Sequence, residues 1–143
     1  MALCEATATT STLLIISRPA VYHRSFGTAA TDNVAIFRDL DSLLTLENYN
    51  GFNLQASPYA YENARQYLEN ASNRMTIPHP EFTPDGEGGI DIEWENQGRR
   101  LALSCRASDC DRDFISWREL GGRYDGSPAT QHLLNQKLDW LTS

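Results

Sequence analysis

The sequence predicts an α+β fold, in which a small antiparallel β-meander of about three strands packs against two to three helices, the last at the C-terminus. Apolar residues recur at helical spacing early in the domain and again near its end, and between these segments they alternate with polar residues as in strands. A chain of 143 residues has the size of one domain. We assign residues 33–143 to that domain, and residues 1–32, rich in Ala, Thr and Ser, to a partly irregular N-terminal arm.

The first helix is expected from Val34, after an arm whose apolar run, 13–16, is expected to form a short strand or an irregular segment on the core. Asp32 or Asn33 is the expected N-cap, and Gly51 is expected to end the segment. Its apolar stripe comprises Ile36, Phe37, Leu40, Leu43 and Leu44. The charged residues that face away are Arg38, Asp39 and Asp41.

A second helix is predicted to begin at Ser57-Pro58. Serine is a good N-cap, and proline suits the first helical position because its missing N–H needs no partner there. We expect this helix to end at Asn70 or Ser72. Its buried stripe comprises Ala60, Tyr61, Ala64, Tyr67, Leu68 and Ala71.

A β-hairpin with Gln97-Gly98 at its tip is the firmest structural prediction, because two segments with strict alternation flank this turn. On one face the predicted pairs are apolar: Ile90 with Cys105, Ile92 with Leu103, and Trp94 with Leu101. On the other face they are polar or small: Asp91 with Ser104, Glu93 with Ala102, and Glu95 with Arg100. A one-residue slip would move every apolar side chain to the wrong face, so the pattern fixes the register.

The meander is expected to continue with a third strand from about Asp113 to Arg118. A turn at 84–86 (Pro-Asp-Gly) is predicted before the hairpin. Ser127-Pro128 repeats the serine-proline signal and is predicted to open the C-terminal helix. The stripe of that helix comprises Leu133, Leu134, Leu138 and Leu141.

Composition excludes several classes of function. Nineteen acidic residues against twelve basic ones give a formal net charge of −7, so direct binding to nucleic acid is not expected, since phosphates require clustered positive charge. No apolar run approaches the roughly 20 residues of a membrane span. The three cysteines, Cys4, Cys105 and Cys110, are interpreted as free thiols in a reducing compartment, and no basic start precedes the first apolar run. We therefore expect a cytoplasmic protein.

No pattern identifies a catalytic residue, a cofactor-binding residue or a metal ligand, and no cofactor is expected. The segment 109–113 has carboxylates at calcium-loop spacing but lacks the glycine at position six. The glycine-rich run 86–89 precedes a strand, whereas phosphate-binding loops precede a helix. The histidines are isolated from one another: His23, His79 and His132.

The charges are segregated along the chain. Residues 81–95 contain six acids and no base, whereas residues 99–123 contain six arginines and four acids. Arginine and tryptophan often anchor protein interfaces. The candidate interaction surface comprises Asp91, Glu93, Glu95, Arg100, Arg106, Trp117 and Arg118.

We therefore expect a small acidic protein–protein interaction or accessory module without catalytic activity, whose partner is another protein or a second copy of the chain. One alternative is an enzyme or a small-ligand-binding protein, with a pocket between sheet and helices lined by Tyr61, His79, Trp94 or Cys105. Another is an acidic mimic, antitoxin-like, that occupies the nucleic-acid site of a basic partner protein.

Two segments carry a resemblance to a protein family. The segment 48–52 (Asn-Tyr-Asn-Gly-Phe) precedes the second predicted helix, and the segment 84–94 joins Pro-Asp-Gly to Ile-x-Ile-Glu-Trp. In this order they resemble the N-W-D-G-Y and P-x-PDG-x-I-x-x-E-W motifs of small uncharacterised bacterial proteins. The resemblance covers about residues 40–106 and implies an α+β layout with no assigned activity. Tyr49 and Asn50 stand where that family has Trp and Asp. Association alone implies an accessory role beside a partner gene product, as in toxin–antitoxin pairs.

Overall fold

The computed structural model describes residues 33–143, and the predicted segment at 13–16 lies outside that range. The elements in chain order are α1 (Asn33–Ser42), the 3₁₀ turn η3 (Leu43–Thr45), α2 (Pro58–Ser72), β1 (Glu81–Pro84), β2 (Ile90–Asn96), β3 (Arg99–Cys105), β4 (Phe114–Arg118), β5 (Asp125–Pro128) and α3 (Gln131–Thr142). The five strands form one sheet in the order β1-β2-β3-β4-β5, and every neighbouring pair is antiparallel. The α+β prediction is confirmed.

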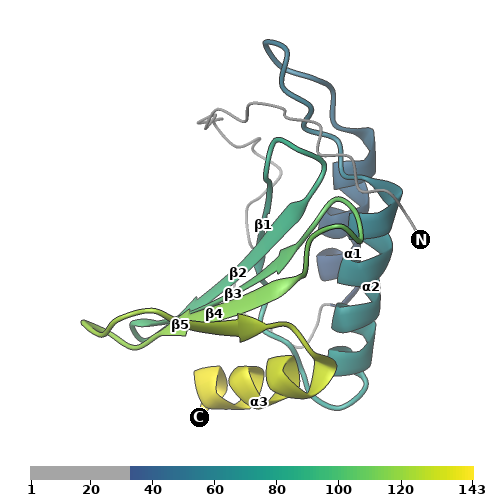
Figure 1. The fold of residues 1–143 in the computed structure, drawn as a ribbon. Helices are drawn as coiled ribbons and strands as arrows, with labels where there is room; N and C mark the ends of the chain where they lie inside the picture. Colours follow the sequence, from purple (N-terminus) through teal and green to yellow (C-terminus); the bar gives the residue numbers. More distant parts are fainter. Residues whose placement is uncertain (1–32) are drawn as a thin grey trace.

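One face of the sheet is covered by the helices, with α2 standing across the strands and α3 lying along the β4–β5 end (Figure 1). The core between these layers takes alternate residues from the central strands, such as Ile92, Leu103 and Ile115, all fully buried. It takes the apolar stripes from the helices, including Leu40, Leu68, Leu134 and Leu138. Because alternation sends every second side chain inward, the remaining side chains of the same strands point away from the helices.

The predicted hairpin is confirmed pair for pair, from Ile90 opposite Cys105 to Glu95 opposite Arg100. The start of α2 is also as predicted. The Ser57 hydroxyl accepts a hydrogen bond from the Ala60 N–H, and Pro58 occupies the first helical position. The third predicted strand corresponds to β4.

The strand count is the main correction, since the sheet has five strands and not about three. β1 and β5 are four-residue edge strands that each contain a proline, Pro84 and Pro128. Edge strands tolerate proline because one side of the strand needs no N–H donor. Ser127-Pro128 therefore belongs to β5 and does not open the last helix. Thr130 caps α3 instead, and its side chain accepts from the Leu133 N–H.

The first helix is shorter than predicted, because α1 and η3 end at Thr45 and not at Gly51. The chain then makes a tight turn in which Tyr49 and Phe52 exchange two backbone hydrogen bonds of 3.0 and 2.8 Å. Both central residues have positive φ, 50° at Asn50 and 83° at Gly51. This is the backbone of a type I′ turn, for which Asn-Gly is the favoured pair.

The cysteines also require a correction. Cys105 is a free, buried thiol, as expected. Cys110 is disulfide-bonded, so the interpretation of this residue as a free thiol is wrong. Among residues 33–143, no helix has the length and apolar character needed to cross a membrane.

A candidate binding face on the sheet

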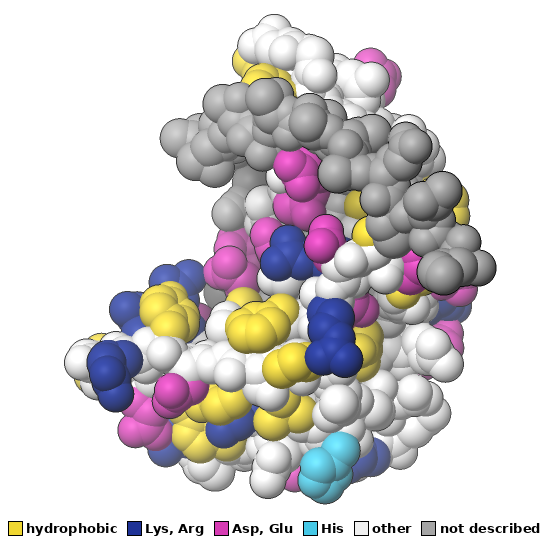
Figure 2. Space-filling view, viewed as in Figure 1, with side chains coloured by type: hydrophobic (Ala, Val, Ile, Leu, Met, Phe, Trp, Pro, Cys, Tyr) yellow, Lys and Arg dark blue, Asp and Glu magenta, His cyan; other side chains and the backbone are white. Residues whose placement is uncertain are grey.

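The candidate site is the sheet surface opposite the helices, here called the outer face. It carries the alternate residues of four strands: Asp91, Glu93, Glu95, Arg100, Ala102, Ser104, Phe114, Ser116, Arg118 and Gly126. Figure 2 shows acidic and basic side chains gathered in the hollow of the molecule on this side. The strand alternation that builds the core therefore also builds this surface.

Strand pairing arranges the outer face in rows that cross the sheet. One charged row joins Glu95 to Arg100 and Arg100 to Arg118. The next row begins with two carboxylates, Glu81 and Glu93, and is small beyond them: Ala102, Ser116 and Gly126. Since these side chains barely rise above the backbone, the face is hollowed over them.

This small-residue hollow has a volume of about 380 Å³. Its lining combines carboxylates, an arginine, two hydroxyls and an aromatic ring: Asp91, Glu93, Arg100, Leu101, Ala102, Ser104, Ser116 and Tyr124. Tyr124 is 54% exposed, and Phe114 on the same side of the sheet is 38% exposed. A Cβ atom at Gly126 would collide with the Phe114 ring, so the ring can occupy this position only because residue 126 has no side chain.

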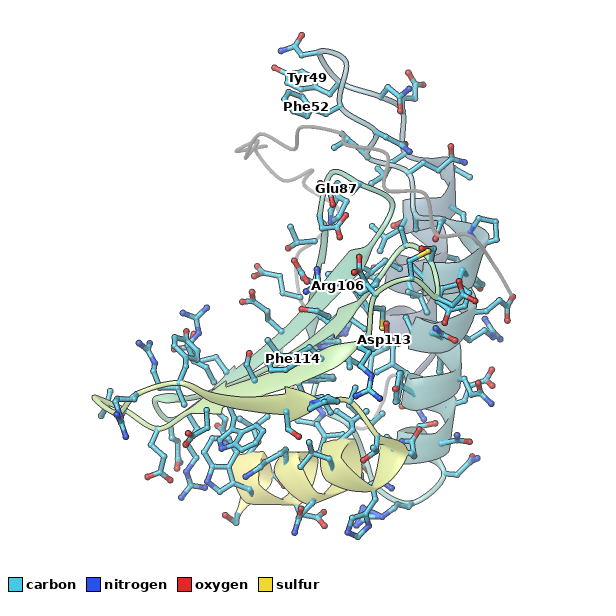
Figure 3. All side chains as sticks on the ribbon, in the orientation of Figure 1. Tyr49, Phe52, Glu87, Arg106, Asp113 and Phe114 are labelled. Carbon is cyan, nitrogen blue, oxygen red and sulfur yellow. The ribbon has the colours of Figure 1, made fainter. Side chains whose placement is uncertain are left out.

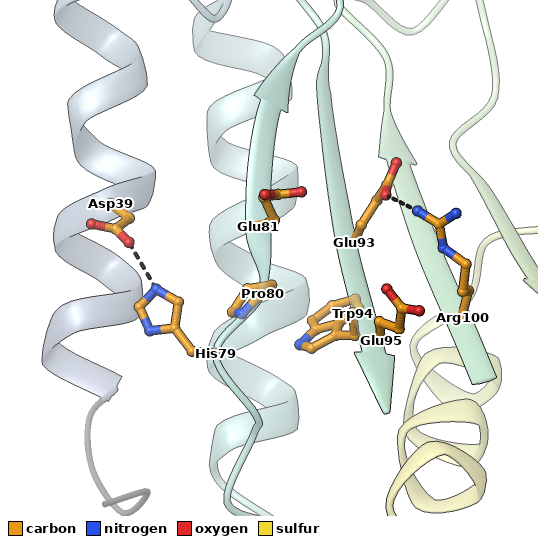
Figure 4. Close-up of a pocket in the computed structure, with 8 residues that line it drawn as sticks. All are labelled: Asp39, His79, Pro80, Glu81, Glu93, Trp94, Glu95 and Arg100. Atoms are coloured by element: carbon orange, nitrogen blue, oxygen red, sulfur yellow. Dashed lines mark hydrogen bonds and ion pairs between the residues drawn. The ribbon is translucent and has the colours of Figure 1, made fainter. Parts of the chain in front are cut away.

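A second hollow, the edge hollow, adjoins the first and has a volume of about 210 Å³. Figure 4 shows its lining residues on α1, β1, β2, β3 and the segment before β1: Asp39, His79, Pro80, Glu81, Glu93, Trp94, Glu95 and Arg100. Glu93 and Arg100 line both hollows, and their side chains form an ion pair of 3.1 Å, each 40% exposed. The two hollows therefore form one surface with an ion pair at its centre.

Asp39 and His79 form a second polar contact at the edge hollow. The Nε2 atom of His79 lies 2.7 Å from the Asp39 carboxylate, although the residues are far apart in the sequence. The indole N–H of the neighbouring Trp94 donates to the Pro78 carbonyl over 2.8 Å, which fixes the chain before β1. A carboxylate that orients a histidine is an arrangement used in general acid–base chemistry, so this contact is the most catalyst-like feature of the site.

Arg106 directly follows β3 and interacts with two partly buried carboxylates, Asp113 and Asp91. Its backbone N–H donates to Asp113 over 2.8 Å, and its charge lowers the pKa of both Asp113 and Asp91. Burial has the larger effect and raises the pKa of both carboxyls above the ordinary value. The charge of Arg106 is thus directed to neighbours within the chain.

Trp117 is not on the outer face. In β4 it pairs with Leu101 and packs against the core, and the Lys137 ammonium of α3 lies 3.9 Å from its ring centre. The structure therefore brings Asp91, Glu93, Glu95, Arg100 and Arg118 together on one face, places Arg106 at its end and turns Trp117 to the opposite side.

Sequence reasoning did not assign Asp39, His79, Phe114 or Tyr124 to this surface. The position of Phe114 on the outer face is predictable, because Phe114 precedes the inward-facing Ile115 at the start of the third predicted strand. Tyr124 follows a turn without periodicity, and the Asp39–His79 contact depends on the packing of α1 beside β1, so neither has a local signal.

Within residues 33–143 no group of three or more His, Cys, Asp or Glu side chains is placed to hold a metal ion. The outer face carries groups that form ion pairs, hydrogen bonds and aromatic contacts. No family model, no curated protein and no solved structure matches the chain.

Proposed function

We propose that this protein is a small interaction module without catalytic activity, which binds a protein partner through the outer face of its sheet. The observation that supports this proposal most directly is the contrast between the two sheet faces. The inner face is closed by three helices, whereas the outer face presents a hollow lined by charged groups and an exposed tyrosine, and the edge hollow adjoins it. Arginine and tyrosine are enriched in protein interfaces, and the rims of such interfaces are polar and solvent-accessible.

The alternative of a pocket between sheet and helices receives less support. Trp94 and Cys105 are 2% and 1% exposed, and both belong to the packed core. His79 lies at the sheet edge, where it contacts Asp39. Burial, followed by the negative charges of Asp113 and Asp91, raises the pKa of the Cys105 thiol well above its usual value, which disfavours the thiolate that nucleophilic chemistry needs.

An acidic mimic would need its carboxylates on one continuous face. Asp91, Glu93 and Glu95 do follow one another along β2 on the outer face. Arg100 and Arg118 lie on the same face, next to these carboxylates. We therefore prefer a partner with both kinds of charge over a purely basic one.

We also propose that the two family-like motif segments are structural. The Asp85 carboxylate accepts from the N–H groups of Glu87 and Gly89 over 2.7 and 2.8 Å, as in an Asx turn. A parallel bridge joins Asn53 to Glu87, so the turn at 49–52 is tied to the loop before β2. Figure 3 shows Tyr49 and Phe52 together at the tip of that turn.

The proposed function is tested by affinity purification of the full-length chain from its native cells under gentle conditions. We expect a stoichiometric protein partner with the wild-type chain, and loss of that partner with Arg100→Glu. Arg38→Glu is the matched control, since Arg38 is exposed on α1 and the substitution changes the net charge equally. Recovery of a monomer alone, or equal loss with both variants, would contradict the proposal.

A further inference from the structure

Arg118 is an arginine of the outer face whose charge has no carboxylate partner in the described part of the chain. Among residues 33–143 it forms no ion pair. Its Nε atom is buried and has no hydrogen-bond partner. Buried donors are almost always paired in folded proteins, so this one calls for a partner that the described residues do not supply, such as water or a bound group.

The neighbours of Arg118 explain why the chain itself leaves it unmatched. The residue directly opposite on β3 is Arg100, whose guanidinium already pairs with Glu93. Two like charges placed opposite one another are unfavourable. Glu95 lies one strand beyond Arg100 in the same row. Arg118 is thus two strands from the nearest carboxylate of its row.

The guanidinium of Arg118 is covered on one side by an aromatic ring. Its Cζ atom lies 4.6 Å from the ring centre of Tyr124, which also lines the small-residue hollow. Stacking on an aromatic ring fixes the guanidinium plane and leaves its edge for a planar, bidentate contact with a carboxylate. The Tyr124 ring is 54% exposed, so a group on the outer face can reach it.

We propose that Arg118 and Tyr124 form an anchor for a carboxylate side chain on an extended segment of the protein partner, which lies in the small-residue hollow. This inference rests on the proposed function and names the chemistry of the partner. The carboxylate pairs with the edge of Arg118, and contact with the buried Nε requires the side chain to shift. A basic residue of the same segment faces Glu95, at the other end of the charged row.

The distance between Glu95 and Arg118 sets the spacing of the two charged residues in the partner segment. Glu95 and Arg118 are separated by two strand spacings, about 10 Å. An extended chain of the polyproline II type advances about 3.1 Å per residue with three residues per turn, so an acidic and a basic residue three positions apart lie on the same side of the segment and about 9 Å apart. A phosphate backbone does not fit this charge pattern, because Asp91, Glu93 and Glu95 would repel its repeated negative charges.

The test uses the ¹⁵N-labelled full-length chain and the probe peptide acetyl-Glu-Ser-Ser-Lys-amide. The Nε–H signal of Arg118 is followed by NMR and is assigned by its disappearance in Arg118→Lys, which keeps the charge but loses the planar fork. We expect a saturable shift of this signal and of the Tyr124 amide. The matched peptide with Gln in place of Glu should bind at least about tenfold more weakly, as should the Glu peptide to Arg118→Lys.

Arg123→Lys is the control variant, because Arg123 is exposed in the turn before Tyr124 and should leave binding unchanged. The proposal is overturned if the Arg118 signal does not move at about 10 mM peptide, or if the Glu and Gln peptides shift it equally. It is also overturned if Arg118→Lys binds like the wild type. If the peptide experiment fails but partner recovery is still lost with Arg100→Glu, the anchor at Arg118 is refuted and the proposed function is not.

Discussion

The two faces of the sheet are built from the same strands and differ in what their alternate residues do. Leu103 and Ile115 are fully buried under the helices, whereas Ala102 and Ser116, their neighbours in the chain, form the floor of a hollow on the outer face. Stability therefore depends mainly on the inner face, since buried apolar area is the dominant favourable term in folding. Residues on the outer face can change at little cost to the fold, which is what a surface specialised for one partner requires.

The largest expected effect tests this division directly. Leu103→Ala should lower the free energy of unfolding by about 3 kcal/mol, because it leaves a cavity in the packed core. Ser116→Ala, on the paired strand but the opposite face, should change it by no more than about 0.5 kcal/mol. Urea unfolding followed by circular dichroism measures both. Equal losses would show that the outer face is part of the stabilising structure.

An intermediate effect is expected at the loop that precedes β2. Asp85→Ala removes the acceptor of two backbone N–H groups, one of them partly buried. We expect a loss of about 1–2 kcal/mol in unfolding free energy, with Asp85→Asn less affected because it keeps an acceptor oxygen. If Asp85→Ala lowered the free energy of unfolding by less than Ser116→Ala, the turn at Asp85 would contribute little to stability.

A smaller effect is expected for the ion pair at the centre of the outer face. Glu93 and Arg100 are both substantially exposed, and such pairs contribute about 0.2–1 kcal/mol. A double-mutant cycle of Glu93→Ala and Arg100→Ala should give a coupling energy in that range, which falls as salt is added. A coupling energy several times larger would assign this pair to the fold and weaken its assignment to binding.

The smallest effect concerns pH. Burial raises the pKa of Asp91, and the negative charges of Asp85 and Glu93 raise it further. A raised carboxyl pKa means that the folded state binds the proton more tightly than the unfolded state, so this residue's contribution to stability is lost as pH rises through the folded pKa. Asp91→Asn cannot ionise and so avoids the cost of a buried carboxylate at higher pH. The stability of this variant relative to the wild type should therefore increase between about pH 4 and pH 7. Denaturant unfolding at the two pH values measures the difference, and a constant difference would contradict the assignment.

The division between the two faces was predictable where the sequence alternates. The register of β2 and β3 follows from the pairing of apolar with apolar residues, and this register places Glu93 and Ala102 on the outer face. The edge strands β1 and β5 are not predicted, because Pro84 and Pro128 are typical of a turn and of a helix start. Nothing local in the sequence indicates that these prolines lie in edge strands. Trp117 was grouped with the arginines by composition, although alternation from Ile115 places it on the inner face.

Contacts between distant segments could not be predicted from the sequence. The Asp39–His79 contact joins α1 to the segment before β1, and the stacking of Arg118 on Tyr124 depends on where a turn without periodicity ends. Local patterns report which side of an element a residue faces. They do not report which residue of another element lies against it.

The central claim, that the outer face is the binding surface, is tested most directly by photo-cross-linking in the native cells. The photoreactive analogue p-azidophenylalanine would replace Tyr124 on the outer side of the sheet or Tyr59 on α2, which are tyrosines with 54% and 42% exposure. We predict that the chain with the analogue at position 124 forms a covalent adduct with the co-purifying protein partner and that the chain with the analogue at position 59 does not. An adduct from position 59 alone, or from neither position while the partner still co-purifies, would contradict the account.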